Sequence, residues 1–289
     1  MKPLVPLDRA EVFFDGGRTP VRLRHAECVA IDAAGDVWCG GESGEIYRID
    51  RDGTALELVA SSNGATLGIA FDEAGYLYVC DAFVGAVDRL DPRSGELRRF
   101  ARVDPGAIRI PNFPVVDTRR GCLYVSDSHS FDEAGPGIWR FDLETGEGGL
   151  WYSDPLRFAN GMALSADGTT LYVAETFARR VIAIEIDDRG RPGEKRVVVD
   201  RVERLPDGLA LDAVGNLLVT CYEPSRIYRL DTDGNFDLLL DDPDAHMLCH
   251  PTNCAFRGND LFIANLGRCH ITRVTLGVGG LPLPVPAAA

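Results

Sequence analysis

The chain has no apolar run long enough to cross a membrane, no C-x-x-C pair and no excess of basic residues. Among its 289 residues, 30 Lys and Arg stand against 44 Asp and Glu, which gives a formal net charge of −14. Because nucleic acids and anionic membrane surfaces attract basic proteins, this charge argues against both as partners. The N-terminus also lacks the apolar core of a signal peptide, so we expect a cytoplasmic protein.

The eight cysteines are scattered along the chain, and most lie in short apolar segments. In such segments a thiol packs like a small apolar side chain. Without an export signal, a disulfide framework is not expected. Hydrophobic residues make up 45% of the chain, which is ample for a packed core.

What the sequence does contain is one pattern repeated six times. In each repeat a short apolar strand leads to a turn and a second apolar strand follows, as in VAIDAAGDVWC (29–39) and IAFDEAGYLYVC (69–80). The equivalent turn positions are 40, 45, 48, 47 and 45 residues apart. They are Asp32, Asp72, Asp117, Ser165, Asp212 and Arg257. A period of this size indicates a repeat architecture.

Each repeat supplies four strands. In the second repeat they are GIAF (68–71), YLYVC (76–80), AVDRL (86–90) and LRRFA (97–101). Four-stranded units of this period are typical of propeller blades. The prediction is an all-β, six-bladed β-propeller with antiparallel blades, forming a single domain over residues 1–289.

The sixth repeat has no convincing fourth strand. The orphan segment EVFFDG (11–16) is predicted to supply it, which would close the ring and remove an open sheet edge. The blades then extend from about residue 11 to 276. The remaining tail, residues 277–289, is rich in proline and is expected to be loosely held.

One residue in each repeat, five positions before the turn, should face the mouth of the central channel. These residues are Glu27, Leu67, Asn112, Asn160, Asp207 and Thr252. Four of the six offer strong oxygen donors, two as carboxylates and two as amides. Such a set suits one hard divalent cation. The alternative is that these polar side chains line a water-filled channel and bind no metal.

The segments around these positions resemble the senescence marker protein/gluconolactonase family of six-bladed propellers. The resemblance covers nearly the whole chain and is carried by HAECVAID, ANGMALSADGTTLYVAET, LPDGLALDAVGNLLV and PTNCAFRGNDLFIAN. It implies that Glu27, Asn160 and Asp207 bind one divalent metal, with Asn112 either a fourth ligand or a substrate contact. Calcium is the expected ion, and zinc, magnesium and manganese are the alternatives.

The function that the resemblance implies is hydrolysis of a lactone, a carboxylic ester hydrolase reaction on a small molecule. The metal would polarise the carbonyl group, and a carboxylate would accept the proton of the attacking water. Asp207 is the first candidate for that carboxylate and Glu27 the second. Two alternatives stay open. One is another reaction at the same metal, such as phosphotriester hydrolysis, and the other is a non-catalytic propeller that binds a ligand or a protein. The oligomeric state is not predicted.

Four further residues are candidates for substrate binding. Arg109 is the nearest match to a sugar-contacting arginine of the family, although its spacing differs, and Phe113 follows Asn112 where gluconolactonases have Asp. Gluconolactone is therefore not assigned as the substrate. His25 and His250 each stand two residues before a channel position. His129 lies in the insertion SDSHSFDEAGPG (126–137), which is either a lid over the channel or a plain surface loop.

Overall fold

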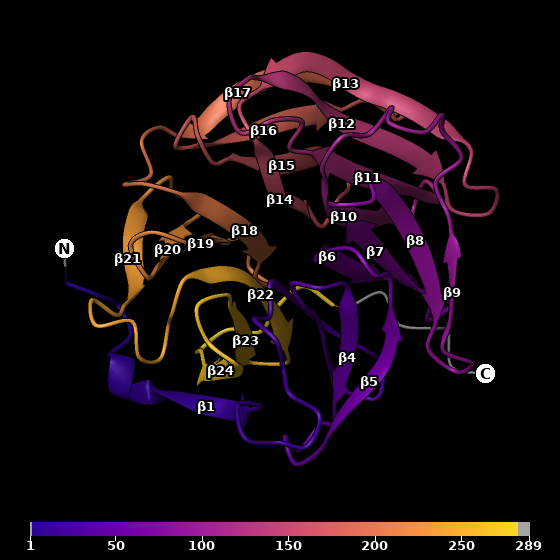
Figure 1. Ribbon diagram of the computed structural model, residues 1–289. Coiled ribbons are helices and arrows are strands. Elements are labelled where there is room, and N and C mark those ends of the chain that lie inside the picture. Colours follow the sequence, from indigo (N-terminus) through magenta and orange to yellow (C-terminus); the bar gives the residue numbers. More distant parts are fainter. Residues whose placement is uncertain (1, 283–289) are drawn as a thin grey trace.

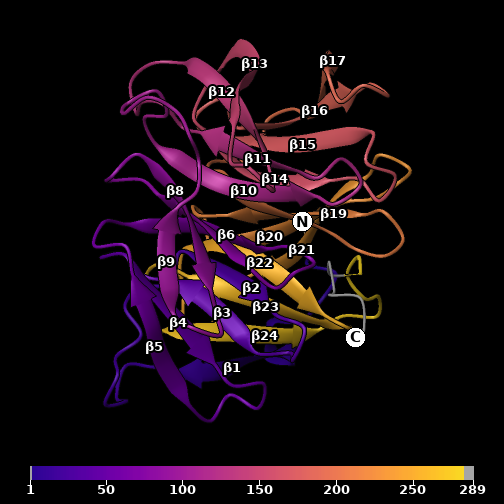
Figure 2. The same cartoon turned by 90° about the vertical axis from the view of Figure 1, so that its right-hand side faces the viewer.

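Short apolar segments, separated by turns that contain Gly and Asp, form the six sheets of the protein. The computed structural model describes residues 2–282. In it, six four-stranded antiparallel sheets are arranged as blades around a central axis (Figure 1). Figure 2 shows the ring from its side. The predicted all-β, six-bladed propeller is confirmed.

The blades are numbered by their place in the chain. Blade 1 contains β2 (Cys28–Ile31), β3 (Val37–Gly40), β4 (Glu45–Ile49) and β5 (Leu56–Ser61). Blade 2 contains β6 (Thr66–Phe71), β7 (Leu77–Asp81), β8 (Ala86–Asp91) and β9 (Glu96–Arg99). Blade 3 contains β10 (Pro111–Asp117), β11 (Cys122–Asp127), β12 (Gly135–Asp142) and β13 (Gly148–Leu156).

The second half of the ring repeats this order. Blade 4 contains β14 (Ala159–Leu164), β15 (Thr170–Glu175), β16 (Arg180–Ile186) and β17 (Pro192–Val199). Blade 5 contains β18 (Pro206–Leu211), β19 (Leu217–Cys221), β20 (Arg226–Leu230) and β21 (Phe236–Asp241). Blade 6 contains β22 (Pro251–Arg257), β23 (Asp260–Asn265) and β24 (His270–Thr275), and a short 3₁₀ helix, η1 (Leu7–Arg9), precedes β1 (Ala10–Asp15).

The N-terminal strand completes blade 6, as predicted. β1 pairs antiparallel with β24, with Ala10 opposite Val274 and Asp15 opposite His270. In Figure 1 the indigo β1 lies along the yellow strands of the C-terminal blade. The pairing joins the first and last strands of the ring, so the last blade does not end in an exposed edge there.

The expectation of a loosely held tail is wrong for the first part of the tail. Ala213 donates a backbone hydrogen bond to Gly279, and Leu281 donates one to Leu211. Leu281 also packs against the core between blades 4 and 5. Glycine and proline made a strand improbable, but backbone hydrogen bonds to a neighbouring turn need no regular strand. Residues 283–289 lie outside the described part of the chain.

The core lies between the blades. Within residues 2–282, apolar side chains form six clusters, one at each junction of neighbouring blades. At the junction of blades 1 and 2, for example, Trp38 and Phe71 meet edge to face, with ring centroids 5.6 Å apart. The cysteines are free thiols, and all but Cys269 are buried, in agreement with the prediction. No helix within the described residues has the length and apolar character needed to cross a bilayer.

The repeated turn residue has a structural role. The Asp32 carboxylate accepts hydrogen bonds of 2.9 Å from the backbone N–H groups of Ala34 and Asp36. Asp72 and Asp212 accept equivalent bonds from residues four positions on. Aspartate stabilises turns in this way. The position that repeats is therefore structural, and function is sought at the position that varies.

Candidate functional site

One small cavity is lined by all six residues that were predicted to face the channel mouth. It lies at the axis and is called the ring cavity below. Its lining is Glu27, Cys28, Leu67, Gly68, Asn112, Phe113, Asn160, Asp207, Thr252 and Asn253. Its volume of about 10 Å³ is close to the minimum that holds one water molecule. The site is therefore sized for a single ion or water at the innermost point.

Local irregularities of the inner strands aim these residues at the axis. In β10, β14 and β18 the pairing with the next strand is interrupted for two residues, and the first of the two is Asn112, Asn160 or Asp207, respectively. Glu27 directly precedes β2. An interruption of this kind frees a side chain from the alternating pattern of the strand and redirects it, which is why bulges recur beside functional sites.

Glycine allows the inner strands to approach closely at this level. A Cβ atom on Gly161 would lie 2.5 Å from the carbonyl oxygen of Asp207, and one on Gly208 would lie 2.6 Å from that of Thr252. The pairs Asn160-Gly161 and Asp207-Gly208 lie inside β14 and β18 and do not form hairpin turns. Each glycine thus brings the ring residues of neighbouring blades close together.

Both amide side chains are fixed by hydroxyl groups. Asn112 Nδ2 donates to Ser128 Oγ at 3.0 Å, and Ser128 Oγ donates to the carbonyl oxygen of Ala159 at 2.8 Å. In the next blade Asn160 Nδ2 donates to Thr176 Oγ1 at 3.1 Å, and Thr176 Oγ1 donates to Pro206 at 2.7 Å. Each hydroxyl thus holds one N–H of its amide, and the amide oxygen is free to face the ring cavity.

The two hydroxyl residues were not among the predicted site residues. Each follows the end of the second strand of its blade and stands sixteen positions after the asparagine that it holds. The dipeptides Asp127-Ser128 and Glu175-Thr176 carry this signal in the sequence. The equivalent position of the two hydroxyl residues is recognised only when the third and fourth repeats are compared with each other.

Hydrogen bonds between blades also fix the backbone near the two carboxylate residues of the ring cavity. Thr252 Oγ1 in blade 6 donates to the carbonyl oxygen of Glu27 in blade 1 at 2.7 Å. Thr220 Oγ1 in blade 5 accepts from the N–H of Gly208 at 2.8 Å and donates to the carbonyl oxygen of Thr252 at 2.8 Å. These bonds fix the backbone on which Glu27 and Asp207 stand.

The two carboxylates of the ring cavity are poorly compensated. Asp207 is buried, and Glu27 is half-buried, with an inaccessible Oε2 atom that has no hydrogen-bond partner within the described residues. Burial raises the pKa of Glu27 well above its usual range, and the charge of Asp207 adds a smaller effect in the same direction. Burial also raises the pKa of Asp207, although a hydrogen bond with Asn160 opposes this. A positive charge in the cavity would reverse both effects.

The donor set fits a hard divalent cation. Within residues 2–282 no three His, Cys, Asp or Glu side chains are grouped to hold a metal. The ring cavity instead combines two carboxylates with two amides, and calcium accepts both kinds of oxygen. The unpartnered Glu27 Oε2 is a buried acceptor that such an ion would satisfy.

Asn253 is a polar residue of the ring cavity that the sequence analysis did not identify. Its Oδ1 accepts a hydrogen bond from the N–H of Val29, and its buried Nδ2 has no partner among the described residues. It also lines a cavity of about 230 Å³ whose other walls are mainly apolar residues of the inner strands. The channel is thus polar at the ring and largely apolar beyond it.

The predicted histidines His25 and His250 do not line the ring cavity. His25 Nδ1 lies 2.7 Å from the carbonyl oxygen of Leu266, and His250 Nδ1 lies 3.2 Å from that of Tyr222. The His250 ring also stacks on Tyr222, with centroids 4.6 Å apart. Both residues precede a ring position by two, so they belong to the loops around the mouth.

Arg109 and His129 contact each other on the loops of blade 3. Arg109 Nη1 lies 3.0 Å from His129 Nε2, and neither residue lines the ring cavity. Asp127 caps this loop by accepting hydrogen bonds from the backbone N–H groups of Arg109, Ile110 and His129. Their substrate-binding roles stay predictions.

Comparison with known proteins identifies the family of this chain. Residues 61–266 match the model of the SMP-30/Gluconolactonase/LRE-like region. Regucalcin from Gallus gallus is 32% identical over 234 residues, which cover 75% of this chain and 72% of that protein.

Two solved structures share the fold. A gluconolactonase from Xanthomonas campestris has a TM-score of 0.75 and 21% identity, covering 92% of this chain and 89% of the other. The calcium-binding protein regucalcin from Agrobacterium tumefaciens also has a TM-score of 0.75, at 19% identity, with 100% of both chains covered. From the match over residues 61–266 and the regucalcin alignment, the chain belongs to the SMP-30/gluconolactonase/LRE-like family.

Proposed function

We propose that this protein is a metal-dependent lactonase whose ring cavity holds one divalent cation through Glu27, Asn112, Asn160 and Asp207. The observation that carries the proposal is the meeting of four oxygen donors from four blades around one cavity of about 10 Å³. The unpartnered, buried Oε2 of Glu27 supports an occupant of positive charge. Calcium is the first choice, because oxygen-only donor sets suit it and a regucalcin of the same fold is described as calcium-binding.

Lactone hydrolysis is the chemistry we assign to this site. Support comes from the family, whose description includes gluconolactonase, and from the gluconolactonase of the same fold. When bound, the cation would supply a Lewis acid that stabilises negative charge on the carbonyl oxygen.

The chain's own residues divide the remaining work. A carboxylate oxygen of Asp207 accepts the proton of the attacking water, with Glu27 as the second candidate for that step. Asn112 and Asn160 do not titrate, and their fixed amides keep the oxygen atoms in place throughout the reaction. The hydroxyls of Ser128 and Thr176 therefore act as positioning groups.

Turnover by chelator-treated protein tests the proposal. A panel of lactones is offered before and after calcium, zinc, magnesium or manganese is restored, with Asp207→Asn beside the wild type. The exposed Asp244→Asn variant is a charge-matched control. We expect metal-restored turnover in the wild type and the control, and its loss in Asp207→Asn. Metal binding without turnover on lactones, but with turnover of a phosphotriester, would reject the lactonase assignment.

A further inference from the structure

Three phenylalanines from separate segments meet on the loops of blades 3 and 4. Phe131 lies between β11 and β12, Phe158 directly precedes β14, and Phe177 lies between β15 and β16. The centroids are 5.0 Å apart for Phe131 and Phe158, 4.6 Å for Phe158 and Phe177, and 6.3 Å for Phe131 and Phe177. These three residues are called the aromatic cluster.

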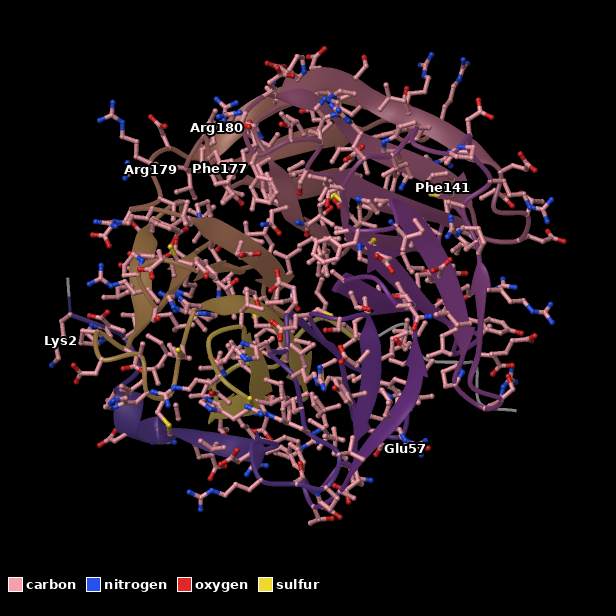
Figure 3. The ribbon with its side chains drawn as sticks, in the orientation of Figure 1. Lys2, Glu57, Phe141, Phe177, Arg179 and Arg180 are labelled. Atoms are coloured by element: carbon pink, nitrogen blue, oxygen red, sulfur yellow. The ribbon has the colours of Figure 1, made fainter. Side chains whose placement is uncertain are left out.

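The aromatic cluster stands beside the ring cavity. Phe158 precedes Asn160 by two residues, and Phe177 follows Thr176, the residue that fixes the Asn160 amide. A backbone hydrogen bond of 3.1 Å from Thr176 to Phe158 ties the two segments together. Figure 3 labels Phe177 beside Arg179 and Arg180 on blade 4. The cluster is therefore built on the same two segments of blade 4 that carry Asn160 and its hydroxyl partner Thr176.

Phe131 of blade 3 contacts an aromatic ring of blade 4 and is exposed to solvent. Its side chain belongs to the insertion of blade 3 and contacts the rings of blade 4, yet the residue is 65% exposed. A single exposed aromatic is unremarkable on most surfaces. Here it extends a packed aromatic group that is two residues from the ring residue Asn160 in the sequence. Aromatic side chains beside a few polar groups are the composition expected of a small-molecule site.

The opposite side of the mouth is polar. Three blades have a residue with positive φ two positions before the ring position, and these residues are His25 (φ 40°), Phe158 (φ 62°) and His250 (φ 53°). The same backbone conformation thus presents an imidazole on blades 1 and 6 and a phenyl ring on blade 4. A ligand that contacts both the imidazoles and the phenyl ring needs a polar end and an apolar end.

We propose that the aromatic cluster binds the apolar substituent of the substrate, so that the enzyme prefers lactones with an aryl or alkyl side chain over polyhydroxylated lactones. This inference rests on the proposed lactonase function. Phe131 is the principal specificity residue, because its ring is both packed and open to a ligand. The insertion at 126–137 then contributes a specificity loop.

Two readouts test this inference with Phe131→Ala. The first is kcat/KM for a phenyl-substituted δ-lactone, unsubstituted δ-valerolactone and gluconolactone in the calcium-loaded protein. We expect the phenyl-substituted lactone to be preferred by the wild type, and the variant to lose about 3- to 10-fold of that preference. Turnover of δ-valerolactone, which lacks the phenyl substituent, should fall less than turnover of the phenyl-substituted lactone. A wild-type preference for gluconolactone, or a preference that Phe131→Ala leaves intact, would overturn the inference.

The second readout does not need activity. Binding of a phenyl-substituted tetrahydropyran, which has no scissile bond, is measured by calorimetry on metal-free protein. We expect about 3- to 10-fold weaker binding in Phe131→Ala. Phe131-dependent binding without turnover of any lactone would reject the lactonase function and keep the aromatic site, whereas turnover with Phe131-independent binding would reject only the aromatic site.

A matched control comes from blade 2. Phe83 occupies the equivalent loop between β7 and β8, is 81% exposed and contacts no other aromatic ring within the described residues. Phe83→Ala should leave both readouts unchanged. An equal loss in Phe83→Ala and Phe131→Ala would contradict the assignment of specificity to the aromatic cluster.

Discussion

Glu27 and Asp207 face one ring cavity from blades 1 and 5, and burial together with the smaller effect of the Asp207 charge raises the pKa of Glu27. Neither side chain has a cationic partner within the described residues. Two buried carboxylates in one cavity are unfavourable unless a proton or a cation joins them. The folded chain tolerates this cost because the inner strands are fixed by hydrogen bonds between blades.

The first prediction concerns the stability of the metal-free protein. Because the pKa of folded Asp207 is raised, the protonated carboxyl favours folding at low pH, and this contribution is lost as the pH rises through the folded pKa. The Asp207→Asn variant has no carboxyl group that must ionise there, so its stability does not fall in this way as the pH rises. In the presence of chelator, the variant should gain stability over the wild type between pH 5 and pH 8, reaching about 1–3 kcal/mol. Urea denaturation at both pH values measures this.

The control for this prediction is Asp244→Asn, at an exposed carboxylate. It removes the same charge without a buried environment, so its effect on the free energy of unfolding should stay small at both pH values. An Asp207→Asn effect that is equal at pH 5 and pH 8 would show that the carboxylate is not destabilised by folding.

The second prediction concerns the hydroxyl that orients Asn160. Thr176→Val keeps the shape of the side chain but removes the oxygen that accepts from Asn160 Nδ2. We expect calcium affinity to fall about 10- to 100-fold, the usual effect of losing a group that orients a ligand. Isothermal titration gives the affinity, and Thr176→Ser should restore most of it. Thr170→Val, at the start of the strand that Thr176 follows, is the control. Unchanged calcium affinity in Thr176→Val would refute the positioning role.

The third prediction assigns Asn112. Its amide is fixed in the same way as that of Asn160, by a hydroxyl that bonds to the next blade. We therefore expect Asn112→Ala to weaken calcium binding about 10-fold or more, as for a metal ligand. The measurement is a calcium titration combined with KM for the best lactone. A rise in KM with unchanged calcium affinity would instead make Asn112 a substrate contact.

The fourth prediction concerns the close approach of the inner strands. A methyl group at Gly161 would lie 2.5 Å from two backbone atoms of blade 5, which cannot move aside cheaply. Gly161→Ala should therefore destabilise the protein by about 1–3 kcal/mol, measured by chemical denaturation. Gly149→Ala, with no atom within 4 Å of the new methyl group, is the control. Equal stability of the two variants would contradict the packing argument.

The sequence predicted the ring of site residues because two regularities coincide. Aspartate marks the same turn in most blades, and a constant five residues separate that turn from the axis. Counting back from Asp212 therefore finds Asp207, and the same count finds Glu27 in blade 1. The irregular pairing at this level is present in several blades, so it does not disturb the count.

The parts that the sequence could not predict depend on contacts between segments. Ser128 and Thr176 directly follow second strands, and their hydrogen-bond partners depend on how neighbouring blades pack, which the sequence of one strand does not reveal. The aromatic cluster requires three loops to meet. The hydrogen bond between Ala213 and Gly279 uses backbone groups alone, so no side-chain pattern predicts it.

A metal centre in the ring cavity is tested by titrating chelator-treated protein with calcium and then measuring lactone turnover in the same sample. We expect one calcium site in the wild type, turnover that rises in step with its occupancy, and loss of both in Asp207→Asn and Glu27→Gln. Turnover that is complete before any metal is added, or binding that persists in both variants, would contradict a metal centre in the ring cavity.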